Sequence, residues 1–255
     1  MSVNNPFFEI SLLPYQAPRF DAINDSHYRP AFDEAMRLKR ADIDAIIAQR
    51  AAPDFDNTVL ALEKSGAMLS RVSSVFFAMT SAHTNDDLQA LDEQFSTELA
   101  GLANDIWLND TLFARVEAVW QDREALDAES RRLTEEMYQH FVLAGARLNA
   151  DEKAELKALN TEAATLTSQF NQRLLAANKA GGLVVDNVHQ LDGLSAEEVA
   201  AAAHAAAEKG LTDRWLIPLL NTTQQPALAA LSLRETRKKL FSAGWERTQK
   251  GDEND

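Results

Sequence analysis

Residues 27–66, HYRPAFDEAMRLKRADIDAIIAQRAAPDFDNTVLALEKSG, contain the first clear helical pattern of the chain. Pro30 suits the first turn of a helix, where its missing amide hydrogen leaves no bond unmade. Apolar side chains then recur at helical spacing, which places them on one face. They are Phe32, Met36, Ile43 and Ile47. The stretch predicts an amphipathic helix, and the same periodicity continues for most of the chain.

Four more apolar stripes with a spacing of three or four residues predict four more helices. Their members are Leu69, Val72, Phe76 and Met79; Leu88, Leu91, Phe95, Leu99, Leu102 and Ile106, entered through Asn85-Asp86-Asp87; Leu112, Val116, Val119 and Trp120; and Leu133, Met137, Phe141, Ala144 and Leu148. Sparse glycine and proline, nine and seven residues, agree with a helical chain.

The longest predicted helix covers roughly 150–180. Asn149 is its expected cap, with acidic residues in the first turn, where they complement the helix dipole. Its apolar stripe contains Leu156, Leu159, Ala163, Leu166, Phe170 and Leu174. This near-heptad spacing predicts antiparallel packing against other long helices.

The pattern changes after Gly181-Gly182, which ends that helix. Residues 183–186 and 215–220 each predict a short strand, and Pro218 favours a sheet edge. Between them, Ser195-Ala196-Glu197-Glu198 predicts a capping box that opens an alanine-rich helix ending at Gly210. A last helix is expected from about Pro226 to Thr248.

These patterns predict a mainly α fold, an antiparallel helical array with a small two-strand α+β insert. We expect an extended N-terminal arm over 1–26, where Phe7, Phe8 and Leu12 are available to pack on a neighbour. A helical domain over 27–180 and the α+β insert over 181–225 follow. The C-terminal helix lies within 226–255, and its Leu240, Phe241 and Trp245 have no following element to cover them.

The composition narrows the class of protein. With 45% hydrophobic and 25% charged residues, the chain is globular in type. Its formal net charge of −14 disfavours binding to nucleic acid or to an anionic membrane surface. The lack of cysteine excludes disulfides and thiolate zinc sites. No apolar run has the length of a membrane helix, and the first residues do not form a secretory signal. We therefore expect a soluble cytoplasmic protein.

No residue pattern in the chain indicates a catalytic or metal site. The histidines are His27, His83, His140, His189 and His204, and no two have the spacing of a helical two-histidine zinc motif. Carboxylate pairs can perform acid–base catalysis. They occur at Asp86-Asp87, Glu135-Glu136, Asp151-Glu152 and Glu197-Glu198. Three of these pairs fall where a helix begins and the fourth on a polar helix side, so we interpret all of them as structural.

Two further features have an ordinary structural interpretation. Gly181-Gly182-Leu183 lacks the pattern of a phosphate-binding loop and indicates a helix end leading into a strand. One basic cluster could hold a peptide carboxylate or a partner domain, but a solvated helix face explains it as well. Its members are Arg234, Arg237, Lys238, Lys239 and Arg247. We therefore predict no catalytic, cofactor-binding or metal residues in this chain.

Several short motifs, in order and at plausible spacing, together resemble one family. They are Asn5-Pro6-Phe7-Phe8, His27-Tyr28-Arg29-Pro30-Ala31-Phe32, Phe55-Asp56-Asn57-Thr58-Val59, Phe141 with Gly145-Ala146-Arg147-Leu148, and Phe170-Asn171. The run 191–195, the strand 215–220, Arg234-Glu235 and Arg247 continue the similarity. The chain resembles the N-terminal portion of the peptidyl-dipeptidase Dcp and thimet-oligopeptidase family of zinc metallopeptidases.

That resemblance implies a largely helical, clam-shaped enzyme in which two His and one Glu hold zinc. Peptidyl-dipeptidase members release C-terminal dipeptides from short peptides. The His-Glu-x-x-His motif of the family has no counterpart in 1–255. We therefore expect this chain alone to bind no zinc and to be inactive. It would form part of the substrate-channel wall and pair with a missing C-terminal catalytic region. The alternative is a freestanding acidic helical binding or regulatory module.

Overall fold

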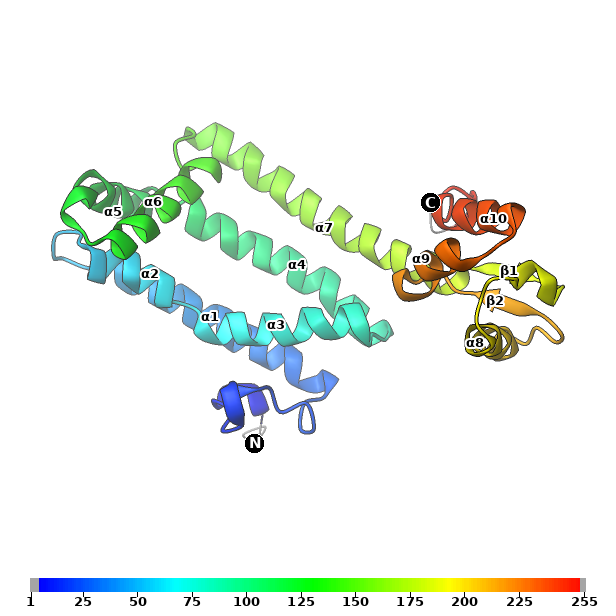
Figure 1. Ribbon diagram of the computed structural model, residues 1–255. Helices are drawn as coiled ribbons and strands as arrows, with labels where there is room; N and C mark the ends of the chain where they lie inside the picture. Colours follow the sequence, from blue (N-terminus) through cyan, green and yellow to red (C-terminus); the bar gives the residue numbers. More distant parts are fainter. Residues whose placement is uncertain (1–4, 253–255) are drawn as a thin grey trace. The chain divides into compact units, whose positions relative to one another are not determined.

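The computed structural model describes residues 5–252, and it is mainly helical, as the apolar stripes predict (Figure 1). The chain divides into two compact units, one extending to Ser168 and the other beginning at Gln169. The boundaries of the predicted arm, helical domain, insert and C-terminal helix stay a prediction. No helix within residues 5–252 is long and apolar enough to cross a membrane.

The first unit is built from helices that begin close to where the sequence patterns place them. They are α1 (Tyr28–Ile47), α2 (Ala61–Lys64), α3 (Ala67–Ala82), α4 (Asp86–Trp107), α5 (Asp110–Gln121), α6 (Ala128–Leu143) and the start of α7 (Ala150–Ala180). The Asn85 side chain accepts the Leu88 amide at the start of α4, which confirms the predicted entry. The stripe ending at Leu148 overestimates α6, which stops at Leu143.

An aromatic cluster joins α1, α3 and α4 at the centre of this unit. Phe32, Phe76 and Phe95 are each fully buried. The rings of Phe32 and Phe95 stack at 3.9 Å between centroids, and Phe76 meets both rings edge-on. Each ring belongs to a stripe read from the sequence, so the predicted apolar faces do meet one another. Burial of aromatic side chains of this size is the main stabilising contribution to such a core.

Arg115 on α5 holds a six-residue π-helical turn, Phe55–Leu60, in place. Its guanidinium donates to the side-chain oxygens of Asn57 and Thr58, at 2.8 and 3.2 Å. It also donates to the Gln49 carbonyl at 3.0 Å. This network accounts for the Phe55-Asp56-Asn57-Thr58-Val59 motif, because a buried arginine requires several oxygen acceptors.

The described part of the N-terminal arm has short 3-10 turns at Pro6–Phe8, Pro14–Gln16 and Asp25–His27. The expectation that Phe7 is free to pack on a neighbour is wrong, because Phe7 is buried against Tyr28 with 5.6 Å between ring centroids. Phe8 and Leu12 are exposed, as expected. Residues 1–4 of the predicted arm lie outside the described residues.

The long helix α7 has the predicted bounds and the predicted cap, since the Asn149 side chain accepts the Glu152 amide at 3.0 Å. The predicted packing of its apolar stripe is wrong. Leu159, Leu166 and Phe170 are each more than half exposed. The contacts of α7 with α4 are made instead by polar side chains on another face of the helix.

The second unit contains the two predicted strands, here β1 (Leu183–Val185) and β2 (Trp215–Ile217). They pair antiparallel, with Leu183 opposite Ile217 and Val185 opposite Trp215. The alanine-rich helix α8 (Ala196–Glu208) begins at the predicted capping box and packs on β2. A small apolar core lies between these elements and the last two helices, and it contains Leu183, Val185, Leu191, Ile217, Leu219, Leu231 and Leu240.

The single C-terminal helix predicted from Pro226 to Thr248 is wrong. Two helices replace it, α9 (Asn221–Ala230) and α10 (Arg234–Trp245), separated by three non-helical residues. This break lets Leu240 turn into the core of the second unit, where it is fully buried. The sequence prediction left Leu240 uncovered. Phe241 and Trp245 are exposed, as expected, and their rings stack on each other at 5.8 Å.

Candidate functional site

The histidines named from the sequence do not gather at one place. His27 is buried, and its ring nitrogen accepts the Asn24 amide at 3.1 Å, so it serves a local turn. The ring of His140 lies against Trp107, with 4.2 Å between centroids. Among residues 5–252, no three His, Asp or Glu side chains are placed to hold a metal ion. These side chains do not fit the zinc that the resemblance implies, and the lack of zinc binding stays a prediction.

The four carboxylate pairs have the structural surroundings expected from the sequence. Three begin α4, α7 and α8. Glu198 shows the consequence for chemistry: hydrogen bonds from the backbone and the side chain of Ser195 lower the pKa of its carboxyl. Glu135 lies 3.4 Å from the Arg123 guanidinium. A carboxyl whose pKa is lowered is a poor general acid, so Glu198 is unsuited to that role.

The glycine pair and the basic cluster also take their structural interpretations. Gly182 adopts a φ of +152°, which suits the turn from α7 into β1. In the basic cluster, Arg237 donates to the carbonyls of Leu231 and Ser232 at the end of α9, and Arg247 donates to the Gly244 carbonyl. These cations satisfy helix-end carbonyls that would otherwise lack donors. Arg234, Lys238 and Lys239 are exposed.

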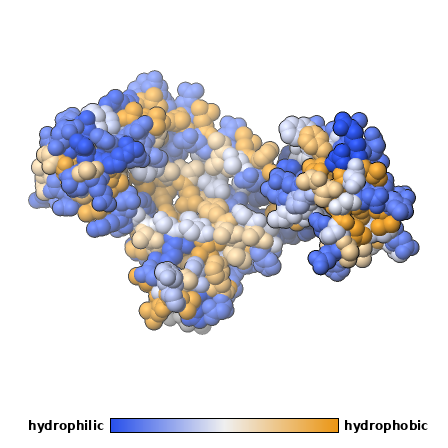
Figure 2. All heavy atoms as spheres, viewed as in Figure 1, coloured by the Kyte–Doolittle hydropathy of each residue, from blue (hydrophilic) through white to orange (hydrophobic). Residues whose placement is uncertain are grey.

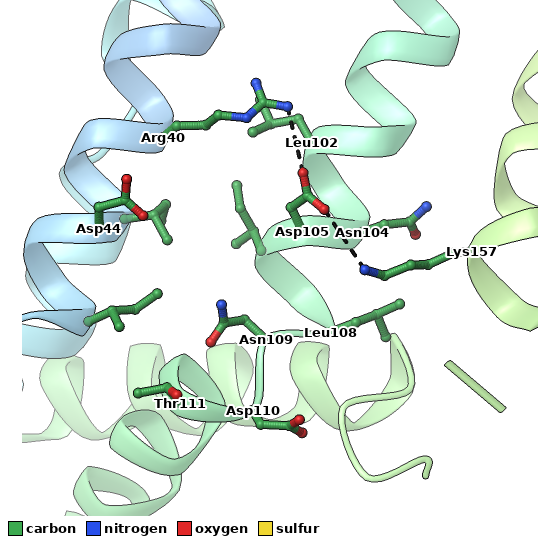
Figure 3. Close-up of a pocket in the computed structure, with 13 residues that line it drawn as sticks. Arg40, Asp44, Leu102, Asn104, Asp105, Leu108, Asn109, Asp110, Thr111 and Lys157 are labelled. Carbon is green, nitrogen blue, oxygen red and sulfur yellow. Dashed lines mark ion pairs between the residues drawn. The ribbon is translucent and has the colours of Figure 1, made fainter. Parts of the chain in front are cut away.

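A polar groove lies in the first unit (Figure 3). It consists of two adjoining cavities of about 560 and 450 Å³. We call it the α1/α4/α7 groove, because four residues line both cavities and come from those helices. They are Arg40 from α1, Asn104 and Asp105 from α4, and Lys157 from α7.

Asp105 occupies the centre of the groove. Its carboxylate lies 3.6 Å from the Arg40 guanidinium and 3.8 Å from the Lys157 ammonium, as the dashed lines in Figure 3 mark. All three side chains are between 46% and 59% exposed. Ion pairs of this length and exposure are weak. Both cations can therefore turn toward another anion at small cost.

The rest of the lining combines hydrogen-bonding groups with an apolar floor. Asn104 accepts a hydrogen bond of 2.7 Å from the Asn160 amide. Asp44 and Asp110 add carboxylates. The apolar lining comes from Ile43, Ile47, Leu102, Ile106 and Leu108. Arginine and lysine complement the carboxylate end of a peptide, and carboxylates complement its ammonium end and its amide groups. The groove thus presents charged groups of both signs and hydrogen-bonding groups beside apolar side chains.

The sequence reasoning did not identify this groove. Its charged residues, Arg40, Asp105 and Lys157, are far apart in the chain and match no motif. The apolar stripes give a weak signal. Asp105 precedes Ile106 and Lys157 follows Leu156, whereas Arg40 stands at helical spacing between Met36 and Ile43. Only the packing of three helices brings them together.

The comparisons with known proteins agree with the predicted resemblance. No family model matches the chain. The chain is 67% identical over 98% of its length to the "Dipeptidyl carboxypeptidase" of Salmonella typhimurium. It is 66% identical over its full length to that of Escherichia coli. A more distant relative, "Oligopeptidase A" of Escherichia coli, is 22% identical over 91% of the chain.

The chain spans 37% and 38% of the length of the two dipeptidyl carboxypeptidases. The relatives that share this identity are peptidases by name. More particularly, the chain's resemblance to the N-terminal portion of the dipeptidyl carboxypeptidases is confirmed, and the more distant oligopeptidases A fit the thimet-oligopeptidase type.

Proposed function

We propose that this chain is the non-catalytic N-terminal portion of a zinc metallopeptidase that releases C-terminal dipeptides from short peptides. The observation that carries the proposal is the identity of 66–67% with dipeptidyl carboxypeptidases over essentially the whole chain. At this identity the chain has the relatives' fold and packing. Among residues 5–252 no three His, Asp or Glu side chains are placed to hold a metal ion, and we assign the chemistry to the portion of those relatives that lies outside the match.

We further propose that the α1/α4/α7 groove is part of the wall of the peptide channel. Two observations support this role. The groove is open and holds groups of both charges, as the termini and amides of a short peptide require. Within residues 5–252, Arg40 and Lys157 form their ion pairs with the shared Asp105, at 3.6 and 3.8 Å. A peptide carboxylate can therefore compete for them.

The first experiment compares the chain alone with the chain co-expressed with the unmatched portion of the Salmonella dipeptidyl carboxypeptidase. Both preparations receive zinc and a blocked short peptide, and released dipeptide is measured by chromatography. We expect release only from the co-expressed preparation. Release by the chain alone, or none by a complex that forms and contains zinc, would contradict the proposal. The second result would favour the freestanding acidic module.

The second experiment tests the groove in the active complex. Arg40→Ala removes a cation of the groove, whereas Arg37→Ala removes an exposed arginine of the same helix that pairs locally with Glu34. If the groove binds substrate, Arg40→Ala raises KM severalfold with little change in kcat, because uniform binding is lost. Arg37→Ala should leave both constants unchanged. Equal KM values for the two variants would remove the groove from substrate binding.

A further inference from the structure

The exposed part of the N-terminal arm is held to the first unit at both of its ends. At the first end, Phe7 is buried, and its carbonyl accepts a 3.0 Å hydrogen bond from the Arg71 guanidinium. At the other end, the Asp25 carboxylate accepts a 2.8 Å hydrogen bond from the Asn85 amide. The segment of residues 8–20 lies between these two anchors. We call it the arm segment.

The arm segment exposes six large apolar side chains. Leu12 and Tyr15 are fully exposed, with relative accessibilities of 100% and 104%. The others are Phe8, Ile10, Leu13 and Phe20, each more than two fifths exposed. Figure 2 shows hydrophobic residues gathered on the N-terminal part of the chain, at the lower edge of the view. Contiguous exposed apolar surface in a globular protein marks an interaction site.

The backbone at the tip of the arm segment is strained. Tyr15 and Gln16 have φ values of 58° and 56°, in the left-handed region that disfavours residues with a side chain. Tyr15 gains no contact in return, because its ring is exposed to solvent. Strain at consecutive non-glycine residues persists where function requires it. Here it accompanies an aromatic ring that is fully exposed to solvent.

The same segment curls around a hollow of about 520 Å³. The apolar lining comes from Pro6, Ile10, Leu12, Leu13 and Ala22. Glu9 and Arg19 add one charge of each sign, and Arg19 is paired with Asp21 at 2.8 Å. The arm segment thus offers projecting apolar side chains beside a recess that could accept an apolar side chain from a partner. This combination is typical of a protein interface with a hydrophobic centre and a polar rim.

We propose that the arm segment is the docking surface for the part of the polypeptide that dipeptidyl carboxypeptidases have beyond the portion matched here. This inference rests on the proposed function. More than three fifths of each of those relatives lies outside the match, which supplies a covalently linked partner large enough to cover the surface. A second copy of this chain is the weaker candidate, because both copies carry a net charge of −14 and repel each other.

The experiment uses the tagged chain, co-expressed with the untagged unmatched portion of the Salmonella dipeptidyl carboxypeptidase. The test variant carries Leu12→Ser and Tyr15→Ser, at positions whose exposure leaves the folding of the chain unaffected. The matched control is Leu143→Ser, an exposed leucine at the end of α6. We expect the test variant to retain at least tenfold less of the untagged portion on the affinity column, and the control to retain as much as the unsubstituted chain.

Equal recovery with the test variant would overturn the proposal, as would failure of the unsubstituted chain to retain the untagged portion. Analytical ultracentrifugation of the chain alone tests whether a second copy of the chain covers the arm segment. A dimer that dissociates on Leu12→Ser and Tyr15→Ser would assign the surface to a second copy and overturn the proposal as well. Dipeptide release is measured separately on the recovered complex. If recovery of the untagged portion depends on the arm segment but the complex releases no dipeptide, the docking surface is supported and the proposed peptidase function is contradicted.

Discussion

Helix α4 contacts α1 and α3 in one way and α7 in another. Toward α1 and α3 it contributes Phe95, a fully buried ring between Phe32 and Phe76. Toward α7 its contacts are polar. The pairs are Asp92 with Ser168, Thr97 with Thr165, Asn104 with Asn160, and Asp105 with Lys157. The apolar face of α7, with Leu159 and Leu166, remains exposed.

This comparison separates the interface that holds the fold from the interface that shapes a groove. Apolar burial contributes stability in proportion to the area removed from water. Hydrogen bonds and ion pairs at an accessible interface contribute little, since water offers the same groups equivalent partners. The α4/α7 interface, beside the groove, is therefore expected to be the weaker of the two. The following substitutions test that ranking.

The largest effect is expected for Phe95→Ala, which removes the ring at the centre of the aromatic cluster. We expect the free energy of unfolding to fall by about 3–5 kcal/mol, because the surrounding rings cannot fill the cavity. Urea unfolding followed by circular dichroism measures the change. Leu143→Ala, at an exposed position, is the control. A loss below about 1 kcal/mol would mean that the cluster is not the main stabilising contact of α4.

A smaller effect is expected for Asn104→Leu. The substitution removes the acceptor of the Asn160 amide, which lies 2.7 Å away, and leaves that amide partly buried without its partner. The expected loss is about 1–2 kcal/mol. The double variant with Asn160→Leu should recover part of it, because neither polar group then lacks a partner. Equal losses in the single and double variants would contradict a direct coupling between the two amides.

Asp105→Asn is expected to change the free energy of unfolding by less than about 0.5 kcal/mol. The carboxylate is 59% exposed, and its ion pairs to Arg40 and Lys157 are 3.6 and 3.8 Å long. The same urea titration decides the matter. A loss as large as that of Asn104→Leu would show that the three-residue bridge holds α7 against α4. It would also weaken the view that both cations are free to bind a peptide.

The smallest effect is expected for Leu159→Ser, on the exposed apolar face of α7. In the chain alone the stability should change by no more than about 0.5 kcal/mol, since the side chain is 55% exposed. Hydrogen exchange of the α7 amides gives an independent measurement. A clear destabilisation would indicate that this face packs on something in solution, as the heptad spacing of the sequence predicts.

The sequence predicts the apolar interface well and the polar one poorly. The stripes that contain Phe32, Phe76 and Phe95 identify the buried faces, because the residues on one buried face of a helix recur every three or four positions. The stripe of α7 repeats in the same way, yet Leu159 and Leu166 are exposed. Periodicity reports which face of a helix is apolar. It does not report whether a partner for that face is present.

The groove and the last helices show two other limits of sequence reasoning. The Arg40, Asp105 and Lys157 constellation depends on helices remote in sequence, and single polar residues on a helix surface give no periodic signal. The sequence predicts one helix from Pro226 onward and gives no sign of the break between α9 and α10. Pro226 instead lies inside α9. The helix ends before Leu231, whose ψ of 127° is not helical. The capping residues Asn85, Asn149 and Ser195 were predicted correctly, because their hydrogen bonds are local.

The two contrasting faces of α4 also respond differently to temperature and to salt. Hydrophobic stabilisation weakens as the temperature falls, so cooling acts on the side of Phe95. Salt weakens ion pairs between exposed side chains, so it acts on the side of Asp105 and Lys157. The contact of α4 at Phe95 is therefore sensitive to temperature, and its contact at Asp105 is sensitive to the salt concentration. Ionic strength can therefore adjust the groove while leaving the aromatic core unchanged.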